Sequence, residues 1–311
     1  MRYRFARPSD FTTLQTLISP GFQASRRVHG SLLELWQTLS ADGCIRMTVV
    51  EDQEQPPEQA IQVITASGFA NEDFVQKYLA NPHPGLAAEV YERVLGGQSP
   101  LLSQREIRAA NSDQGLHLIM LHFALRNPDL QDASVQQLMV AVNAAFFFFY
   151  GGYRLKSAMQ EVNGRQAAEY MKAGGFHIVS DFSDGRATKP RDTDQYLLLL
   201  RKDQVQPSVV NPLSFLFYPV PPRIHFSVAE QKLLELALLN ESDLEISEGL
   251  GVSLDAVKKT WRRAYQRAAR SAPHLLGSGE EIDGSSRGVE KRRHLLEYVR
   301  IHPEELRAHN P

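Results

Sequence analysis

The sequence of 311 residues has a single cysteine, Cys44, and almost no net charge. One cysteine excludes an internal disulfide and a zinc site built from several cysteines, and it fits a reducing compartment. The 34 basic and 36 acidic side chains leave a net charge of −2. The whole molecule therefore lacks a positive field that would attract nucleic acid, and any basic surface has to be local.

Long apolar segments are also missing. Met1 leads directly into sequence that is typical of a folded domain, without an apolar signal segment. The most apolar run, Leu138–Tyr153, is shorter than the ~20 residues of a membrane span and contains Asn143. With 42% apolar and 23% charged residues, the composition is that of a globular protein. We expect a cytoplasmic protein that does not associate with a membrane.

The glycine-rich and serine-centred motifs of common enzyme classes are absent as well. The sequence has no Walker loop, no dinucleotide-binding fingerprint and no G-x-S-x-G nucleophile motif. His117, His122 and His177 do not have the spacing of metal ligands, so we predict no metal site. The basic segment Ser25–His29 is interpreted as a solvated loop rather than an anion site.

The first two thirds of the chain alternate between strand-like and helix-like patterns, which predicts a layered α+β domain over residues 1–202. The expected strands are Tyr3–Ala6, Ile45–Glu51, Gln62–Phe69, Leu116–Leu125, Arg154–Glu161, His177–Phe182 and Tyr196–Arg201. The expected helices are Phe11–Ile18, Leu32–Leu39, Phe74–Ala80, Gly85–Leu95, Val135–Phe149 and Arg165–Ala173.

Proline marks the end of this domain. Prolines 207, 212, 219, 221 and 222 predict a linker over residues 203–225, because proline at this density interrupts both helix and sheet. The apolar segment Phe215–Tyr218 inside it is expected to pack on one of the domains. The pattern of residues 226–276 predicts only helices. Residues 277–288 are Gly/Ser-rich and are predicted to form a loop. Residues 289–311 are predicted to form a basic amphipathic segment with a helix from Val289 to about His302.

Capping residues define three helices after residue 226. Ser227-x-x-Glu230 and Ser242-x-x-Glu245 are capping boxes that open the first two helices. Gly251 then supplies a turn, where a positive φ is favourable without a Cβ. Ser253 caps the third helix. A short helix, a glycine turn and a third helix are typical of a helix-turn-helix.

Charge is sorted by element in this region, with the basic residues on the third helix. Between Ser253 and Arg270, six basic residues accompany one acid, Asp255, whereas the two preceding helices are acidic. This distribution indicates that the third helix contacts nucleic acid. An ordinary helical bundle with a solvated basic face is the alternative. The six basic residues are Lys258, Lys259, Arg262, Arg263, Arg267 and Arg270.

The segments Phe226–Glu230, Asp243–Ser253 and Ala256–Thr260 together resemble the LuxR-type helix-turn-helix and its sigma-factor relatives. The sequence departs from the family at Ala256, where threonine is usual, and Trp261 is interpreted as a core residue. The resemblance implies a DNA-binding surface that contacts phosphates and base edges. The expected DNA-binding residues are Ser253, Lys258, Lys259, Thr260, Arg262, Arg263 and Arg267.

The first domain resembles the GNAT N-acyltransferase fold at two places. Asn163–Phe176 is similar to the family's helix that begins at Asn and ends in Gly-Phe, and Arg2–Asp10 is similar to its first strand and helix start. The resemblance implies a mixed sheet flanked by helices over residues 1–202, and, for an active member, acyl-CoA bound at a helix N-terminus.

The phosphate-binding loop of that family is not preserved. Asn127–Ser134 contains no glycine, has Pro128 without an N–H, and carries acids at Asp129 and Asp132, which would repel a pyrophosphate. The family's tyrosine acid falls on Tyr170 or on Met171, depending on the end from which the helix is counted. We therefore predict no catalytic residue and no bound cofactor, and the residues of any cofactor site are unknown.

These observations predict a transcriptional regulator with a catalytically degenerate GNAT-like domain that senses a small molecule, an acyl-type effector or a partner, or mediates dimerisation. We expect double-stranded DNA as partner and a homodimer, with contacts from the apolar helix end Phe146–Tyr150 or from Leu295, Leu296 and Val299 of the last helix. Core packing is the other interpretation of Phe146–Tyr150. The alternative functions are an active N-acyltransferase with an appended helix-turn-helix, and a helical module that binds proteins.

Overall fold

The computed structural model describes residues 1–18, 22–183, 194–205, 212–276 and 286–309. Within it the chain forms two compact units, which are described separately below. The first unit contains Met1–Phe149 and Arg154–Tyr218, and the second contains Tyr150–Tyr153 and Pro219–Pro311.

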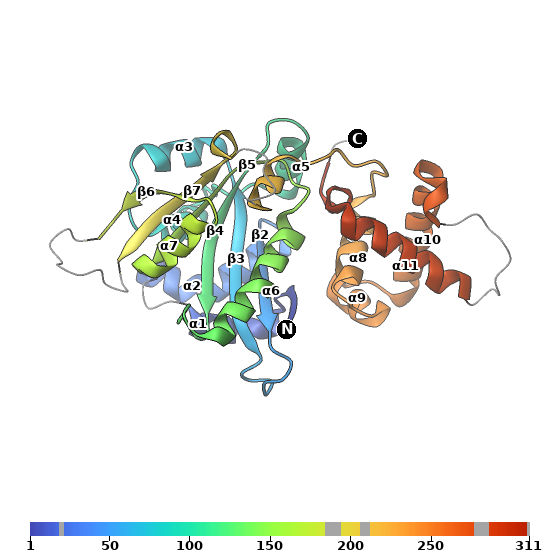
Figure 1. Ribbon diagram of the computed structural model, residues 1–311, viewed down its shortest axis with the longest axis horizontal. Helices are drawn as coiled ribbons and strands as arrows, with labels where there is room; N and C mark the ends of the chain where they lie inside the picture. The colour runs from blue at the N-terminus through green and yellow to red at the C-terminus, as the bar shows by residue number, and fades with distance from the viewer. Residues whose placement is uncertain (19–21, 184–193, 206–211, 277–285, 310–311) are drawn as a thin grey trace. The chain divides into compact units, whose positions relative to one another are not determined.

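A mixed seven-stranded sheet with the order β1-β2-β3-β4-β5-β7-β6 forms the centre of the first unit (Figure 1). Neighbouring strands pair antiparallel except β4 and β5, which are parallel and are connected through α6. All seven strands predicted from the sequence are present. They are β1 (Arg2–Phe5), β2 (Ile45–Glu51), β3 (Ile61–Ala70), β4 (Leu116–Leu125), β5 (Leu155–Asn163), β6 (His177–Asp181) and β7 (Gln195–Arg201).

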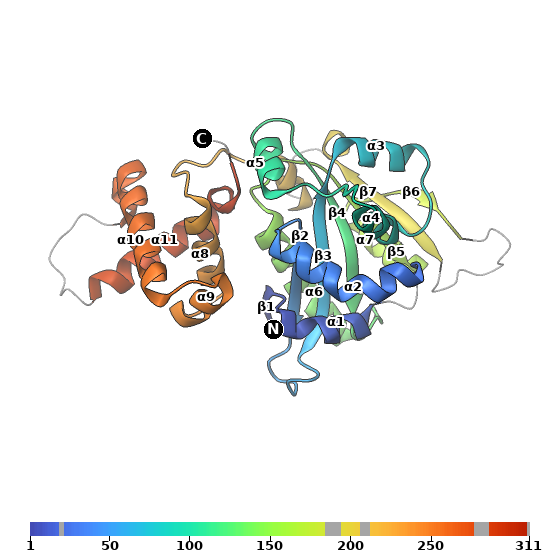
Figure 2. The same cartoon turned by 180° about the vertical axis from the view of Figure 1, so that it is seen from behind.

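Helices cover both faces of this sheet, as expected for a mixed sheet flanked by helices. Figure 1 shows α6 and α7 over one face, and Figure 2 shows α1, α2 and α4 over the other. The helices of the unit are α1 (Phe11–Leu17), α2 (Arg26–Ala41), α3 (Glu72–Ala80), α4 (Leu86–Leu95), α5 (Gln104–Ser112), α6 (Ala133–Tyr150) and α7 (Arg165–Ala173), with 3-10 turns η1 (Pro8–Asp10), η2 (Lys202–Gln204) and η3 (Pro212–Phe217).

Two helices differ from the expectation. The helix predicted at Leu32 begins at Arg26, because the Ser25 side chain accepts the Val28 N–H and caps it. The segment Ser25–His29 is thus the start of α2 and not a loop. Helix α5 was not predicted, because its sequence is strongly polar, although Ser103 and Glu106 form a capping box at its start.

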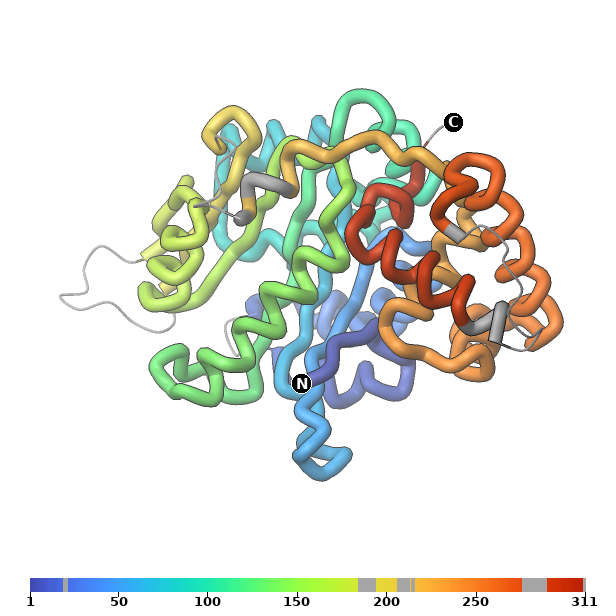
Figure 3. Tube along the Cα trace, turned by 45° about the vertical axis from the view of Figure 1, so that its right-hand side comes forward, coloured from blue at the N-terminus to red at the C-terminus, as the bar shows by residue number. Residues whose placement is uncertain are grey.

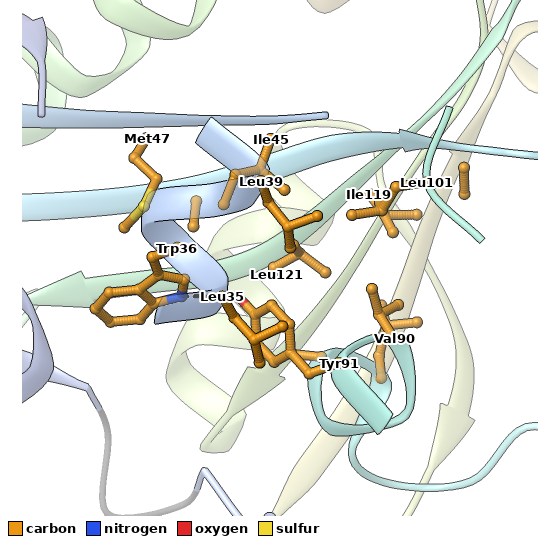
Figure 4. Close-up of a cluster of buried hydrophobic side chains, with 14 of the residues drawn as sticks. Leu35, Trp36, Leu39, Ile45, Met47, Val90, Tyr91, Leu101, Ile119 and Leu121 are labelled. Atoms are coloured by element: carbon orange, nitrogen blue, oxygen red, sulfur yellow. Dashed lines mark hydrogen bonds between the residues drawn. The ribbon is translucent and has the colours of Figure 1, made fainter. Parts of the chain in front are cut away.

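Large apolar side chains fill the layer beneath α2 and α4. Trp36 and Tyr91 are fully buried, and the Trp36 Nε1–H donates to the Tyr91 hydroxyl at 3.0 Å. Leu39, Ile119 and Leu121 lie in the same cluster (Figure 4). The bonded indole and phenol satisfy each other's polar groups inside an apolar layer, which makes their burial favourable.

Helix α6 packs on the opposite face. Its Val135, Leu138 and Val142 lie against Val50 and Val63 of the sheet. Of the part of the chain that the structure describes, this is the one helix that could span a membrane by length and composition, and a core helix passes the same test. Of its C-terminal aromatic residues, Phe149 and Tyr150 are buried, with Tyr3 and Phe5 in contact with Phe149, whereas Phe146, Phe147 and Phe148 are only partly buried.

The proline-rich segment begins as part of the first unit. Leu216 and Phe217 of η3 are buried and η3 contacts β5, so the apolar segment packs on the sheet as expected. The first unit consequently extends to Tyr218 instead of ending near residue 202.

The second unit is helical. It contains α8 (Val228–Leu238), α9 (Asp243–Leu250), α10 (Leu254–Ser271) and α11 (Ser286–Ile301), with 3-10 turns η4 (Pro273–Leu276) and η5 (Pro303–Leu306). Figure 3 shows α11 alongside α8 and α10 in this unit, with which it has contacts. The predicted loop over residues 277–288 lies mostly outside the described residues, and its last three residues belong to α11.

A buried carboxylate joins the two ends of the second unit. Glu305 is 0% exposed, and its oxygens accept the backbone N–H groups of Arg223, Ile224 and His225 and the Tyr298 hydroxyl. Arg307, also buried, donates to Glu235 of α8. The last helical segment is therefore part of the helical unit's core and not an appendage.

A half-exposed ion cluster of Glu72, His117 and Lys156 connects α3 to the sheet. Glu72 accepts hydrogen bonds from Lys156 at 2.6 Å and from His117 at 3.0 Å, and these bonds lower its pKa to about 2. A carboxylate with a lowered pKa stabilises the fold above its ordinary pKa, and this stabilisation is lost as the pH falls toward 2.

We expect Glu72→Gln to reduce the free energy of unfolding at pH 7 by about 1 kcal/mol, a small value because the pair is solvated, and to have no effect near pH 2. Urea denaturation between pH 2 and pH 7 measures the difference. The exposed Glu58→Gln is the control. An equal loss of unfolding free energy at pH 2 and at pH 7 would show that the ionised Glu72 carboxylate does not stabilise the fold.

Candidate nucleic-acid interface and sheet cleft

Strands β4 and β5 separate partway along their length. Their parallel pairing runs from Leu116 to Met120 of β4. Opposite β3, Ala66 pairs with His122 and Ser67 with Met120, so Leu121 is an extra residue in β4. A bulge of this kind bends a strand. Beyond it, a cavity of about 70 Å³ lies between the two strands, bordered by Met120–Ala124 of β4 and Glu161 and Asn163 of β5.

Glu161 closes this cavity on the α4 side. Its carboxylate accepts the N–H of Gly85 at 2.9 Å and the N–H of Leu86 at 2.8 Å, and so caps α4. Burial raises the pKa of Glu161, and the two backbone donors oppose that shift. The positive end of the α4 dipole is thus neutralised by a side chain of the protein itself.

The loop before α6 is closed to an anion in the same way. The Asp132 carboxylate accepts both the N–H and the hydroxyl of Ser134, at 2.8 and 2.7 Å. The Asp129 N–H donates to Asn127, and the Gln131 N–H donates to Asp129. The backbone N–H groups of Asp129, Gln131 and Ser134 are therefore already bonded, and Asp132 places a negative charge beside them.

Neither candidate for the tyrosine acid lies at the cavity. Tyr170 is 38% exposed, and its hydroxyl accepts a weak hydrogen bond from Asn143 at 3.4 Å. Neither Tyr170 nor Met171 borders the cavity. His122 and Glu161, which do, were not identified from the sequence, since no motif or spacing marks them.

The chain Ser157–His117–Glu72 resembles a relay, but its hydroxyl end is buried away from substrate. His117 Nδ1 lies 2.7 Å from the Ser157 hydroxyl and its Nε2 lies 3.0 Å from Glu72. Ser157 is only 4% exposed and does not border the cavity. These bonds join β4, β5 and α3. Across the described ranges, no three His, Cys, Asp or Glu side chains gather as a metal site.

The helix pair α9–α10 has the local structure expected of a helix-turn-helix. Ser227 with Glu230 and Ser242 with Glu245 form the predicted capping boxes. Gly251 has φ of 63°, a conformation in which a Cβ is unfavourable. The Ser253 hydroxyl accepts the Ala256 N–H at 3.2 Å and so caps α10.

Helix α10 has one buried face and one basic face. Val257, Ala264 and Ala268 are buried with Trp261, which is 5% exposed and so is a core residue, as expected. The Trp261 indole N–H donates to Asp243, and Arg292 of α11 covers its ring at 4.5 Å. The opposite face carries exposed Lys258, Lys259, Arg262, Arg263 and Arg270.

The seven residues predicted to contact DNA do not all lie on that face. Lys258, Arg262 and Arg263 are exposed, and Lys259 is exposed while paired with Asp255 at 2.8 Å. The Thr260 hydroxyl donates to the Ala256 carbonyl of its own helix, and Ser253 acts as the cap.

Arg267 is engaged within the protein. It donates to Glu230 at 2.8 Å, and the Glu230 side chain is 2% exposed. Glu230 also accepts the Ser227 N–H at 2.7 Å. This arginine compensates a buried charge and links α8 to α10, so we leave it out of the proposed interface.

No protein-family model matches the chain, and no curated protein matches it. Among solved structures, a histone acetyltransferase HPA2-related acetyltransferase from Corynebacterium glutamicum overlaps with a TM-score of 0.36 and 14% identity, over 67% of this chain and 98% of that chain. A spermidine N-acetyltransferase SpeG variant from Vibrio cholerae gives a TM-score of 0.36 and 13% identity, over 65% of this chain and 95% of that chain. The NatC complex bound to Gag peptide and CoA gives a TM-score of 0.33 and 11% identity, over 65% of this chain and 99% of that chain.

Overlaps with these TM-scores and identities do not assign this chain to a family. The feature that agrees with a GNAT-like first unit is its own mixed sheet flanked by helices. The helical second unit is compatible with a helix-turn-helix, and the LuxR-type assignment stays a prediction.

The engagement of Arg267 gives the second prediction. Arg267→Ala leaves the buried Glu230 carboxylate without its cation, which costs roughly 1–3 kcal/mol for a buried charged acceptor. Arg270→Ala, on the exposed side of the same helix, should cost less than about 0.5 kcal/mol. Chemical denaturation followed by helical circular dichroism measures both. Equal losses in the two variants would show that the Glu230 pair does not stabilise the unit.

Proposed function

We propose that this protein binds double-stranded DNA through the basic face of α10 and acts as a transcriptional regulator. The observation that carries the proposal is the division of α10 into a buried face around Trp261 and an exposed face with Lys258, Arg262 and Arg263. A helix exposed in this way after a glycine turn can enter a major groove, where lysine and arginine contact phosphates and guanine edges.

The local charge supports the same proposal. The whole chain carries −2, so attraction to DNA depends on local basic surfaces such as this face. A single face with few basic residues binds weakly at physiological salt. We therefore propose that two copies of the chain bind together, with two α10 helices in half-sites one helical turn apart.

The double variant Lys258→Ala/Arg262→Ala tests this. We expect roughly 10- to 100-fold weaker binding to selected genomic fragments, from the loss of two groove contacts. The slope of log K against log salt should decrease in magnitude by about 2. Fluorescence anisotropy across a salt series measures both quantities, and footprinting of the bound fragments measures the half-site spacing.

The matched control is Lys77→Ala/Lys172→Ala, which removes the same charge from exposed positions of the first unit. It should bind DNA like the unmodified chain. If the α10 variant also bound like the unmodified chain, or if no genomic fragment were bound, the second unit would not be a DNA-binding module. A protein-binding module and an ordinary helical bundle are then the remaining interpretations.

The cleft between β4 and β5 supports a second candidate, an acyl-CoA-dependent N-acyltransferase, because this fold and cavity could hold an acyl group. The bonded loop at Asp132 argues against it. Titration calorimetry with acetyl-CoA and longer acyl-CoAs decides between them. We expect no binding; saturable binding with thiol release in the presence of an amine would establish the enzyme instead.

A further inference from the structure

Asp255 is the one acidic residue of α10, a helix that the structure describes in full. Lys259, Arg262 and Arg263 follow it after four, seven and eight residues, which places all four side chains on one side of the helix. All four are exposed, whereas Trp261 lies on the buried side. A carboxylate therefore lies within the surface that we propose to face DNA.

The packing of the second unit does not account for this carboxylate. Other acids of the unit have structural contacts: Glu230 is buried, and Asp243 accepts the Trp261 indole N–H. The Asp255 side chain is 65% exposed and pairs with Lys259 of its own helix at 2.8 Å. This pair and the dipole of the first helical turn stabilise the start of α10 slightly.

An acid on this face weakens binding to the DNA backbone, because every phosphate is negative. The carboxylate is favourable only beside a hydrogen-bond donor, and DNA has such donors on its base edges and not on its phosphates. Lys259 lowers the pKa of Asp255. The carboxylate consequently stays ionised at neutral pH and acts only as an acceptor.

The donor pattern of the major groove then selects one base. Guanine presents two acceptors, N7 and O6, and thymine presents the O4 acceptor and a methyl group. Adenine has the N6 donor, but its N7 acceptor lies beside it and repels a carboxylate. Cytosine presents its N4 amino donor without an acceptor on the same base. An ionised carboxylate in the groove is therefore matched best by cytosine.

The position of Asp255 in the helix suits a contact with a base. It is the second residue of α10, and the N-terminal residues of a recognition helix are those that contact base edges. The ion pair with Lys259 uses the Oδ2 atom. Since a carboxylate has about four acceptor sites, Asp255 can accept a base amino group without losing this pair.

We propose that Asp255 determines part of the base specificity of this protein by accepting a hydrogen bond from the N4 amino group of a cytosine in the major groove. The inference rests on the proposed function, because it needs α10 to lie in the groove. It goes further by stating that each half-site contains a C·G pair opposite the start of α10.

The experiment uses the full chain and genomic fragments selected by it. Each C·G pair in the protected half-sites is changed in turn, and binding is measured by fluorescence anisotropy. For the unmodified chain, we expect one position per half-site at which the change weakens binding at least about fivefold. For Asp255→Ala, the same change should weaken binding less than about twofold.

A cytosine analogue without the 4-amino group, 2-pyrimidinone, then tests the hydrogen bond itself. At the selected position it should weaken binding of the unmodified chain about fivefold more than binding of Asp255→Ala. The comparison between the two proteins cancels the effect of the analogue on the duplex. Asp255→Asn, which keeps the shape and removes the charge, should also lose the preference for cytosine.

Binding to a scrambled duplex should change in the opposite direction. Removing the acid relieves repulsion of the phosphates, so Asp255→Ala should bind this duplex roughly two- to fivefold more tightly at low salt. The matched control is Asp73→Ala, which removes an exposed acid from the first turn of α3 that pairs with Lys77 at 2.8 Å. It should leave base preference and scrambled-duplex binding unchanged.

The outcomes separate this inference from the proposed function. If the unmodified chain binds DNA and both Asp255 variants keep every base preference, Asp255 only stabilises the helix start, and the inference is wrong while DNA binding stands. Equal effects of 2-pyrimidinone on the unmodified chain and on Asp255→Ala would contradict it in the same way. If no genomic fragment is bound, the proposed function fails and the inference fails with it.

Discussion

The short parallel pairing between β4 and β5 determines where the cavity of the first unit lies. The pairing stops at Met120, where Leu121 is inserted as a bulge. Up to that point, His117 and Ser157 bond across the two strands and hold them together. Beyond it, β5 pairs only with β7, and the space that opens is bordered by His122 and Glu161. One extra residue in a strand therefore accompanies the opening of a polar cavity at the edge of the β4–β5 pairing.

In both units, carboxylate side chains accept backbone N–H groups at helix N-termini. Asp132 precedes α6, Glu161 caps α4, and Glu230 and Glu245 complete capping boxes on α8 and α9. At each of these ends a side-chain oxygen of the chain occupies the place where a bound anion would otherwise accept backbone N–H groups. In the first unit, Asp132 accepts the Ser134 N–H at the start of α6. In the second unit, Ser253 caps α10, whose outer face is basic.

Most elements could be predicted from sequence, because local signals agreed with the tertiary structure. Strand-like sequence patterns predicted every strand, and capping residues with Gly251 predicted the three helices around the turn. Helix α5 was missed because polar residues dominate it, even though Ser103 and Glu106 carried a usable signal. The position of the apolar segment at Phe217 was anticipated, but not the face on which it would pack.

The candidate sites were only partly predictable. A basic side chain on a helix can point outward or inward, and its neighbours in sequence do not tell which: Arg263 is exposed, whereas Arg267 reaches Glu230, which lies 37 positions earlier in the chain. His122 was treated as one scattered histidine, because the bulge that directs it among Phe22, Trp36 and Tyr91 is a property of strand register. Contacts set by register or by distant partners leave no local pattern.

The two tryptophans of the chain are divided between the units, and this gives the protein a built-in pair of optical reporters. Trp36 lies in the first core with its indole bonded to Tyr91, and Trp261 lies in the second beneath the Arg292 guanidinium. An indole under a cation and an indole bonded to a phenol differ in emission. Replacing either one with phenylalanine leaves a single fluorophore, so the unfolding of each unit can be followed separately in the intact chain.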